Sequence, residues 1–411
     1  MKRLKFFFFL FMIVPCGFSK AFGQPKILYQ LGPRPYYLID QLPSSKLKNE
    51  LKACTTKSIQ KSYFSIAHRG APLMFPEHSR ESYLAAIRMG AGVIECDVTF
   101  TKDKKLVCRH SQCDLHQTTD ILQRPELAKS CRKAFMPFDA SQGRAASAEC
   151  CTSDISLAEF KTLCAKMDGL NPEAKNVQEY LAGTPAWRTD LYNNCADTMS
   201  HRDSIVLAKK YDVSVSPELK QPLVAMPFRE KFTREKYRRL IVQEYKDEQF
   251  PVERVWLQSF ELDDIKFWLK AYPNFARQAV YLDGRYTARG FDYKKPETLK
   301  PTMKELKDIG INFIGSPLWM LLATDKGNNL VPSAYSKEAR AAKLSLIAWT
   351  LERSGPISNT NDWYYSSINR AIKSEGDLFQ VIDVLAKDVG VKKIFSDWPA
   401  TVTYYANCFN L

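Results

Sequence analysis

An alternation of short apolar segments with helical segments is the feature that most constrains the fold of this chain. The apolar segments that read as strands lie near residues 63–67, 93–98, 213–220, 255–260, 278–282, 312–317, 344–350 and 393–397. Helical patterns stand between most of them, and such an alternation predicts an α/β fold with a parallel sheet. Eight strands of this kind close a (β/α)8 TIM barrel, with residues 105–110 forming a hairpin arm beside the second strand.

A cysteine-rich stretch from about residue 111 to 200 breaks this rhythm. It holds Gly, Pro, Asn and most of the cysteines, and within it we expect a short helix near residues 156–167. The stretch therefore predicts an inserted subdomain after the second strand and its hairpin arm. With 45% hydrophobic and 25% charged residues, the composition is globular, so residues 24–411 are expected to form one TIM-barrel domain.

The N-terminus has the pattern of a secretory signal. Basic residues precede an apolar run at 6–14, and the small residues Ala21 and Gly23 fit a cleavage site before Gln24. The apolar run is too short to span a membrane as a helix. We therefore expect a signal peptide over residues 1–23 and a secreted or periplasmic protein.

The charge of the chain is basic but dispersed. The formal net charge of +14 falls to about +10 without the first 23 residues, which carry four basic and no acidic side chains. Lys and Arg form no compact block, so we expect no nucleic-acid partner. A weak contact with an anionic membrane surface stays open, as does the oligomeric state.

Ten cysteines remain after removal of the signal, and an even number in an exported protein predicts disulfides. Five of them lie between Cys113 and Cys164, so that region is expected to be stapled. The connectivity stays open. Zinc binding is the alternative, but the sequence has no CxxC pair and few histidines.

Two carboxylates stand two residues apart in the segment IECDV. On a strand, Glu95 and Asp97 point to the same face, while Cys96 points away and is expected to be packed or bridged. Paired carboxylates repel one another unless a cation lies between them, and oxygen ligands suit Mg²⁺ or Ca²⁺. The pair therefore predicts a site for one divalent cation.

The hairpin that follows is expected to bring a histidine to these carboxylates. Its turn-like residues centre between Lys102 and Asp103, which pairs Glu95 with His110 and Asp97 with Cys108. On this register the His110 imidazole lies beside the cation site.

The first strand ends in His68, Arg69 and Gly70. Histidine is the usual proton carrier near neutral pH, and arginine offers a planar fork for phosphate oxygens. Glycine lets the backbone turn close to a ligand. These residues predict acid–base chemistry on a phosphate group.

The motifs HRGAP, PEHS, GAG, IE-DV, TKD and LV-RH follow one another within residues 64–118, and SPELK, LQSF, AWT and FSDWP follow in order. This set resembles the glycerophosphodiester phosphodiesterase family, of secreted or periplasmic type. The resemblance implies His68 and His110 as acid and base. It also implies Glu95, Asp97 and Glu218 as metal ligands, and Arg69, Lys220 and Trp349 as substrate-binding residues. One departure is Ser111, which stands where the family commonly has Asp.

Several of these residues, together with Gln258, Ser316 and Asp397, fall near the ends of predicted strands. Barrel enzymes carry their chemistry at the C-terminal ends of the strands, so the strand pattern supports the same site independently. His78 is expected to shape a loop, and His116 and His201 have weaker claims to the site.

The expected activity is metal-dependent hydrolysis of glycerophosphodiesters, which are deacylated phospholipids, to sn-glycerol 3-phosphate and an alcohol. Two alternatives stay open. One is a phospholipase-like lyase that acts on intact lipids and forms a cyclic phosphate. The other is a non-catalytic surface binding protein on the same scaffold.

Overall fold

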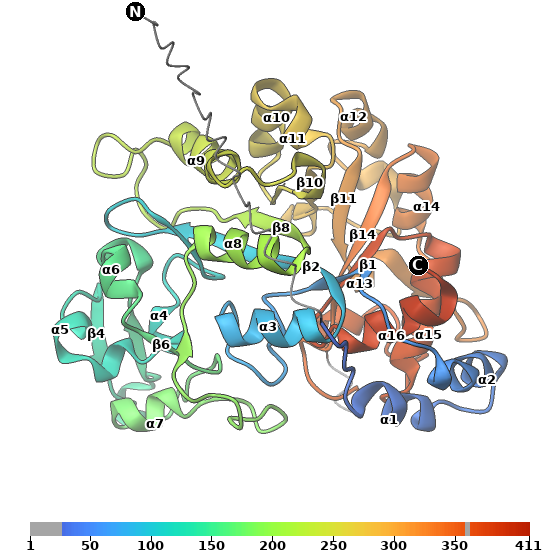
Figure 1. The fold of residues 1–411 in the computed structure, drawn as a ribbon, viewed down its shortest axis with the longest axis horizontal. Helices are drawn as coiled ribbons and strands as arrows, with labels where there is room; N and C mark the ends of the chain where they lie inside the picture. Colours follow the sequence, from blue (N-terminus) through green and yellow to red (C-terminus); the bar gives the residue numbers. More distant parts are fainter. Residues whose placement is uncertain (1–26, 358–361) are drawn as a thin grey trace, which may run out of the picture.

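The computed structural model describes residues 27–357 and 362–411, and its centre is a closed barrel of eight parallel strands (Figure 1). The signal predicted over residues 1–23 lies outside the described residues. The barrel strands are β1 Ser62–Ala67, β2 Ala91–Phe100, β8 Ser214–Leu219, β9 Gln258–Ser259, β10 Val280–Leu282, β11 Phe313–Pro317, β14 Ser345–Leu351 and β15 Lys393–Ser396.

Pairing of the first strand with both the second and the last closes the barrel. Residues 65–67 of β1 pair with 394–396 of β15 on one side, and residues 66–67 pair with 93–94 of β2 on the other. Side chains from five of the strands fill the interior with a small apolar cluster, namely Ile66, Val93, Val280, Leu282, Ile347 and Phe395. The expected (β/α)8 fold is confirmed.

A helix follows each barrel strand and covers its outer side. These helices are α3 Arg80–Arg88, α8 His201–Tyr211, α9 Arg234–Asp247, α10 Leu262–Ala271, α12 Met303–Asp308, α14 Ala334–Ala341, α15 Asp377–Val384 and α16 Ala400–Phe409. Their starts follow the sequence: the Ser79 side chain accepts from Ser82 N ahead of α3, and Ser200 and Asp203 form a capping box at α8.

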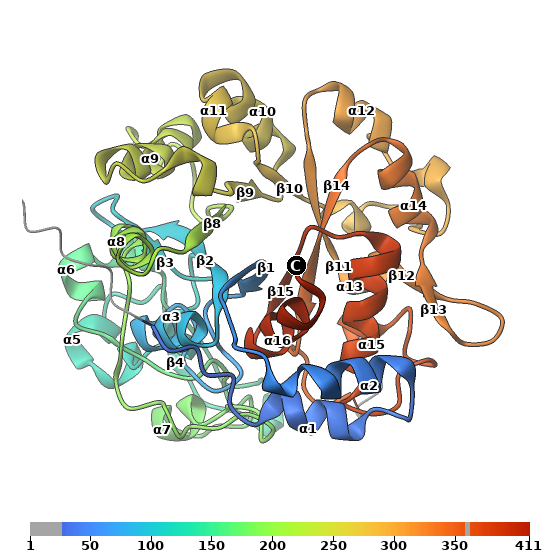
Figure 2. The ribbon, with the colours of Figure 1, turned by 45° about the vertical axis from the view of Figure 1, so that its right-hand side comes forward.

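The N-terminal helices α1 Arg34–Gln41 and α2 Lys46–Ala53 lie beside α15 and α16 (Figure 2). A disulfide between Cys54 and Cys408 fixes this contact between the two ends of the chain. Among the described residues, no helix combines the length and the apolar character that crossing a bilayer requires.

The hairpin arm is shorter than expected, and its register differs by one residue from the prediction. β3 spans Leu106–Cys108, and Cys108 pairs with Val98 rather than with Asp97. The reason is the loop: Thr101 exchanges backbone hydrogen bonds with Lys105 and Lys104, so the turn centres on a residue instead of between two. The predicted Glu95–His110 pairing is therefore wrong, and His110 lies beyond the end of β3.

The stretch between β3 and α8 forms a lobe beside the barrel, with its own buried apolar cluster (Figure 1). Two small antiparallel pairs organise it: β4 Lys133–Met136 with β5 Ser147–Glu149, and β6 Cys164–Ala165 with β7 Ala196–Asp197. Its short helices are α4 Leu115–Thr118, α5 Pro125–Ala128, α6 Leu157–Phe160 and α7 Val177–Leu181. The helix expected to reach residue 167 ends early, because Cys164 enters β6.

Five disulfides pair all ten cysteines of the described residues. They are Cys54–Cys408, Cys96–Cys108, Cys113–Cys151, Cys131–Cys150 and Cys164–Cys195. Three of them lie within the lobe or at its base, as expected for a stapled region. Because Cys113 and Cys151 are bonded to each other, their closeness to Glu149 marks a disulfide and no zinc site.

Candidate active site

A cavity of about 360 Å³ opens at the C-terminal ends of the barrel strands. It brings together all eight residues that the sequence nominated for catalysis, substrate and metal, along with several aromatic side chains. Its lining consists of His68, Arg69, Glu95, Asp97, His110, Glu218, Lys220, Gln258, Phe260, Leu282, Tyr286, Trp349, Trp363, Tyr364 and Phe395.

Three carboxylates form the floor of the acidic part of this cavity. Glu95 and Asp97 come from β2 and Glu218 from β8, where Asp97 and Glu218 pair directly. One oxygen from each lies within 4.8 Å of the others, and all three residues are buried. The adjacent strand register thus gathers three oxygen donors that could share one cation.

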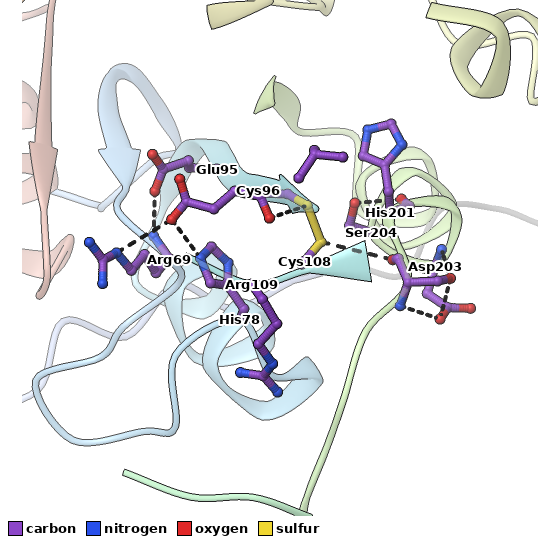
Figure 3. Close-up of a disulfide and its surroundings, with 12 residues drawn as sticks. Arg69, His78, Glu95, Cys96, Cys108, Arg109, His201, Asp203 and Ser204 are labelled. Atoms are coloured by element: carbon purple, nitrogen blue, oxygen red, sulfur yellow. Dashed lines mark hydrogen bonds and ion pairs between the residues drawn. A yellow bond between two sulfur atoms is a disulfide. The ribbon is translucent and has the colours of Figure 1, made fainter. Parts of the chain in front are cut away.

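Two hydrogen bonds fix the Glu95 carboxylate of β2. Glu95 accepts from Arg69 N at 2.8 Å and from Gln258 Nε2 at 3.1 Å. Figure 3 shows Glu95 directed toward Arg69, whereas the next residue, Cys96, is bonded to Cys108 across the hairpin. The disulfide therefore anchors β2 directly behind the acidic cluster.

His78 supports the cluster from the side of the loop before α3. Its Nε2 lies 2.8 Å from Asp97 Oδ2, and its Nδ1 lies 2.8 Å from Tyr83 Oη. Because a carboxylate can only accept, Nε2 carries the proton and Nδ1 accepts from the Tyr83 hydroxyl. His78 thus positions Asp97, beyond the loop-shaping role expected from the sequence.

Lys220 lies against the remaining carboxylate. Its Nζ is 2.7 Å from Glu218 Oε1 and 3.5 Å from Asp97 Oδ1. The salt bridge between Lys220 and Glu218 exists, and both side chains still line the cavity. Asp97 Oδ1 is buried and accepts no hydrogen bond from any described residue, so one oxygen of the cluster has unused capacity to accept or to bind a cation.

Burial and mutual repulsion control the charge of the cluster. Burial raises the pKa of Glu95 well above its usual value, and the neighbouring Asp97 and Glu218 raise it further. Burial likewise raises the pKa of Glu218 to about 7. For Asp97, burial is outweighed by the charge of Lys220 and the bond from His78, which hold its pKa well below the usual range. A hard divalent cation fits this set, because it would neutralise three crowded oxygen donors.

The two histidines differ in their surroundings. His68 Nδ1 lies 2.6 Å from Asp397 Oδ1, so its proton sits on Nδ1 and Nε2 is left to exchange protons. Burial lowers the pKa of His68, although Asp397 opposes this. His110 lacks such a partner among the described residues, and burial together with Arg69 and Lys220 lowers its pKa strongly.

The turn after β1 requires glycine. Arg69 and Gly70 both have positive φ, 56° and 99°, and a Cβ at Gly70 would lie 2.3 Å from Ser82 Oγ. This turn directs the Arg69 side chain into the cavity, where Nη1 pairs with Glu77 at 2.8 Å and Nε lies 3.5 Å from Asp97.

Sequence reasoning missed a buried network behind His68 and Arg69. Arg353 contacts Asp397 at 3.1 Å, Glu77 at 3.0 Å and Asp168 of the lobe at 3.1 Å. Glu77 stands beside His78 in the PEHS motif and could have been found there. Arg353 lies in an irregular loop after β14 and carries no comparable signal.

Other candidates lie outside the cavity. Ser316 Oγ bonds to Tyr335 Oη, His201 pairs with Glu244, and His116 packs on Tyr180 in the lobe. Asp114, close to the position where the family commonly has Asp, is buried and accepts from Ser111 N at 2.8 Å. It therefore holds the loop that follows His110.

Comparisons with known proteins identify the family of this chain. The model of the glycerophosphoryl diester phosphodiesterase family matches residues 68–401. A protein of Arthroderma benhamiae named an extracellular protein is 46% identical over 252 residues, covering 60% of this chain and all of the relative. A glycerophosphodiester phosphodiesterase of Arabidopsis thaliana is 31% identical over 184 residues, covering 44% of this chain and 43% of the relative.

A crystal structure from Silicibacter pomeroyi, assigned as a glycerophosphoryl diester phosphodiesterase, superposes with a TM-score of 0.54. It is 14% identical, and the match covers 88% of this chain and 97% of that one, which supports the barrel fold alone. The family match includes every residue that lines the cavity, from His68 to Phe395. The chain therefore belongs to the glycerophosphoryl diester phosphodiesterase family and is an enzyme of the phosphodiesterase class.

Proposed function

We propose that this enzyme hydrolyses glycerophosphodiesters to sn-glycerol 3-phosphate and an alcohol in a cation-dependent reaction. The observation that carries the proposal is the gathering of three carboxylate oxygens within 4.8 Å, in the same cavity as His68 and His110. The expected substrate is a small deacylated phospholipid, and the volume of about 360 Å³ suits such a molecule.

Glu95, Asp97 and Glu218 would hold one divalent cation, Ca²⁺ or Mg²⁺. When bound, it would stabilise charge on the phosphate and lower the pKa of a hydroxyl or water beside it. The unbonded Asp97 Oδ1 and the raised pKa values of Glu95 and Glu218 support this assignment.

The histidines are proposed to move the protons. One accepts the proton of the attacking hydroxyl, and the other gives a proton to the leaving alcohol. The Asp397 carboxylate stabilises the protonated form of His68, which favours His68 as the acceptor. His110, which has no such carboxylate partner among the described residues, would then serve the leaving oxygen.

The remaining nominated residues are proposed to bind substrate. Arg69 and Lys220 would stabilise phosphate oxygens. Both side chains lie 3.5 Å from Asp97, so their positive charges stand next to the proposed cation site, where the phosphate would bind. Trp349 would form a wall for the glycerol moiety. Glu77 restrains Arg69, so the guanidinium is held in place before substrate arrives.

We also propose a secreted location. Five disulfides, the signal pattern at residues 1–23 and the extracellular name of the Arthroderma relative support it. The mature chain would be a single domain of residues 24–411 with an inserted subdomain of about 111–200. Contact with an anionic membrane surface would be weak, because the basic residues form no compact block.

The test is release of glycerol phosphate from purified protein with added Ca²⁺ or Mg²⁺, and its loss with EDTA. His110→Ala and Glu95→Ala should each abolish turnover, and an unaffected rate in either would count against the mechanism. Phosphorus NMR separates the alternatives: a persistent cyclic phosphate favours a lyase. Release of no phosphate ester from any glycerophosphodiester favours a binding protein.

A further inference from the structure

The inserted lobe lies beside the barrel, and none of its residues from 111 to 200 lines the catalytic cavity (Figure 1). The lobe has an apolar cluster and disulfides of its own, so its folding does not require a contact with the site. One carboxylate of the lobe, that of Asp168, nevertheless joins the buried network behind His68 and Arg69. This contact connects the lobe to the proposed chemistry.

A short chain of ion pairs leads from Asp168 to the proposed proton acceptor. Asp168 Oδ2 lies 3.1 Å from Arg353 Nη2. The other end of this guanidinium, Nη1, lies 3.1 Å from Asp397 Oδ2, and Asp397 Oδ1 bonds His68 Nδ1 at 2.6 Å. Arg353 is therefore the only link between the lobe carboxylate and the carboxylate that orients His68 within this chain of contacts.

A second branch of the network leads to Arg69. Arg353 Nη2 lies 3.0 Å from Glu77 Oε2, and the same oxygen lies 2.8 Å from Arg69 Nη1. One guanidinium thus holds two carboxylates, of which one orients the proposed proton acceptor and the other restrains the proposed phosphate ligand.

The position of Arg353 depends on its side-chain partners. It lies in the irregular loop after β14, and no backbone hydrogen bond joins it to another described residue. Burial lowers the pKa of Arg353, but its carboxylate neighbours more than offset this effect, and Asp168 contributes most among them. Without Asp168, the guanidinium would lose its strongest charge partner and would be free to shift toward the remaining carboxylates.

Asp168 is held on a closed segment, residues 164–195, which we name the brace. A disulfide joins the two ends of the brace. Lys166 Nζ donates to the backbone oxygens of the residues on either side of Asp168. The backbone that carries the Asp168 carboxylate is therefore restrained before the carboxylate meets Arg353.

Arg188, also in the brace, connects Asp168 to the barrel. Its side chain is only 4% exposed. Nη1 pairs with Asp168 Oδ1, and Nη2 donates to the backbone oxygen of Pro72 in the loop after β1. This is the loop that begins with His68 and Arg69, so Arg188 fixes the lobe carboxylate relative to the proposed catalytic side chains.

We propose that Asp168 is a positioning residue, through which the inserted lobe sets the geometry of a cavity that it does not line. Asp168 holds Arg353, and Arg353 holds the carboxylate partners of His68 and Arg69. The inference rests on the proposed function, because it takes from it the roles of His68 and Arg69. It gives the brace a part in turnover in addition to its part in the fold.

The test uses the full-length mature enzyme with added Ca²⁺ or Mg²⁺, on glycerophosphocholine or glycerophosphoethanolamine, whichever the wild type hydrolyses faster. Asp168→Asn removes the charge and keeps the size of the side chain. We expect its kcat to fall by about 10- to 100-fold, because a displaced Asp397 misorients His68. KM should change less, because Arg69 keeps its own pair with Glu77.

A double-mutant cycle shows whether Asp168 acts through Arg353. Arg353→Gln alone should lower kcat at least as much as Asp168→Asn does. In the Arg353→Gln background, Asp168→Asn should cause no further fall, because the link to the site is already broken. Asp168→Glu, which keeps the charge, should recover part of the kcat that Asp168→Asn loses. A role in stability alone predicts neither result.

The matched control is Asp154→Asn. Asp154 is also a carboxylate of the lobe, 19% exposed against 21% for Asp168, and it pairs with Arg132 at 3.5 Å outside the network. Arg132 in turn donates to the backbone oxygen of Leu223 in the barrel, so the control also loosens a contact between lobe and barrel. Its kcat should stay within about twofold of the wild type.

Three results would overturn the inference and leave the proposed function intact. They are a kcat for Asp168→Asn within about twofold of the wild type, equal falls in Asp168→Asn and Asp154→Asn, and a further fall on adding Asp168→Asn to Arg353→Gln. If Asp168→Asn yields too little folded protein by near-UV circular dichroism, Asp168→Ala takes its place with the same expected results. A wild type that hydrolyses neither substrate would reject the proposed function, and the inference with it.

Discussion

The His68 Nδ1 atom lies 2.6 Å from Asp397 Oδ1, although 329 residues separate the two in the chain. His68 follows β1 and Asp397 follows β15, which are the strands that meet where the barrel closes. The orientation of a proposed catalytic imidazole therefore depends on the pairing of the first and last barrel strands. Any change that opens this seam is expected to affect activity as well as stability.

Replacing Asp397 by Asn tests this relationship. The amide can donate to His68 Nδ1, which would move the imidazole proton to Nε2 and leave His68 without a nitrogen that can accept a proton from the cavity. We expect kcat to fall by about 100-fold or more with a small change in KM. Steady-state kinetics check this, with the Tm measured as a control for folding. A kcat within twofold of the wild type would exclude a role for the pair.

Arg353 provides a second prediction, because it bonds to Asp397, Glu77 and Asp168 at once. Arg353→Gln would leave buried carboxylates without their cation, which costs about 3 kcal/mol of unfolding free energy. We expect urea unfolding to report this loss and kcat to fall with it. Arg239→Gln, which removes an exposed pair with Glu235, is the control and should change neither.

The strand ends of the barrel made most of the site predictable. Glu95, Asp97 and Glu218 follow from strand alternation and the family resemblance, because barrel geometry brings neighbouring strand ends together. The hairpin register was missed because a turn closed by Thr101 and Lys105 shifts the pairing by one residue. Loop length decides this shift, and the residue types alone did not reveal it.

Loop residues escaped prediction for a different reason. Arg353 and Trp363 lie in the connection after β14, whose path has no periodicity to read. Their partners are far away in sequence: 276 residues separate Arg353 from Glu77. Disulfide connectivity is hidden for the same reason, because Cys54 meets Cys408 only through the packing of α2 against α16.

Glu95→Gln tests the cation site through stability, with no need to measure activity. The raised pKa of Glu95 means that the folded protein binds more protons than the unfolded chain, so the metal-free wild type loses stability as pH rises from about 4.5. Glutamine removes this charge, and Gln258, whose Oε1 has no hydrogen-bond partner among the described residues, can turn to accept from it. The variant should therefore fold at least as stably as the metal-free wild type at pH 7.

The cation response should differ between the two proteins. Ca²⁺ or Mg²⁺ should raise the Tm of the wild type and have a much smaller effect on Glu95→Gln. Thermal unfolding with EDTA and with each cation measures this. Equal increases in Tm for both proteins would place the cation elsewhere.

His116 links the stability of the lobe to pH. Burial lowers its pKa to about 4, and its Nδ1 accepts from Cys150 N at 3.4 Å, which requires the neutral imidazole. Since the unfolded pKa is about 6.5, the unfolded chain binds more protons between these values. The stability that neutral His116 provides is complete above pH 6.5 and is lost as pH falls toward 4, by at most about 3 kcal/mol.

His116→Gln keeps an acceptor but does not titrate, so urea unfolding should show a smaller loss of stability between pH 7 and pH 4.5 than in the wild type. Turnover at pH 7 should stay unchanged, because His116 lies outside the cavity lining. Identical pH dependence of unfolding in the two proteins would show that protonation of His116 does not destabilise the lobe.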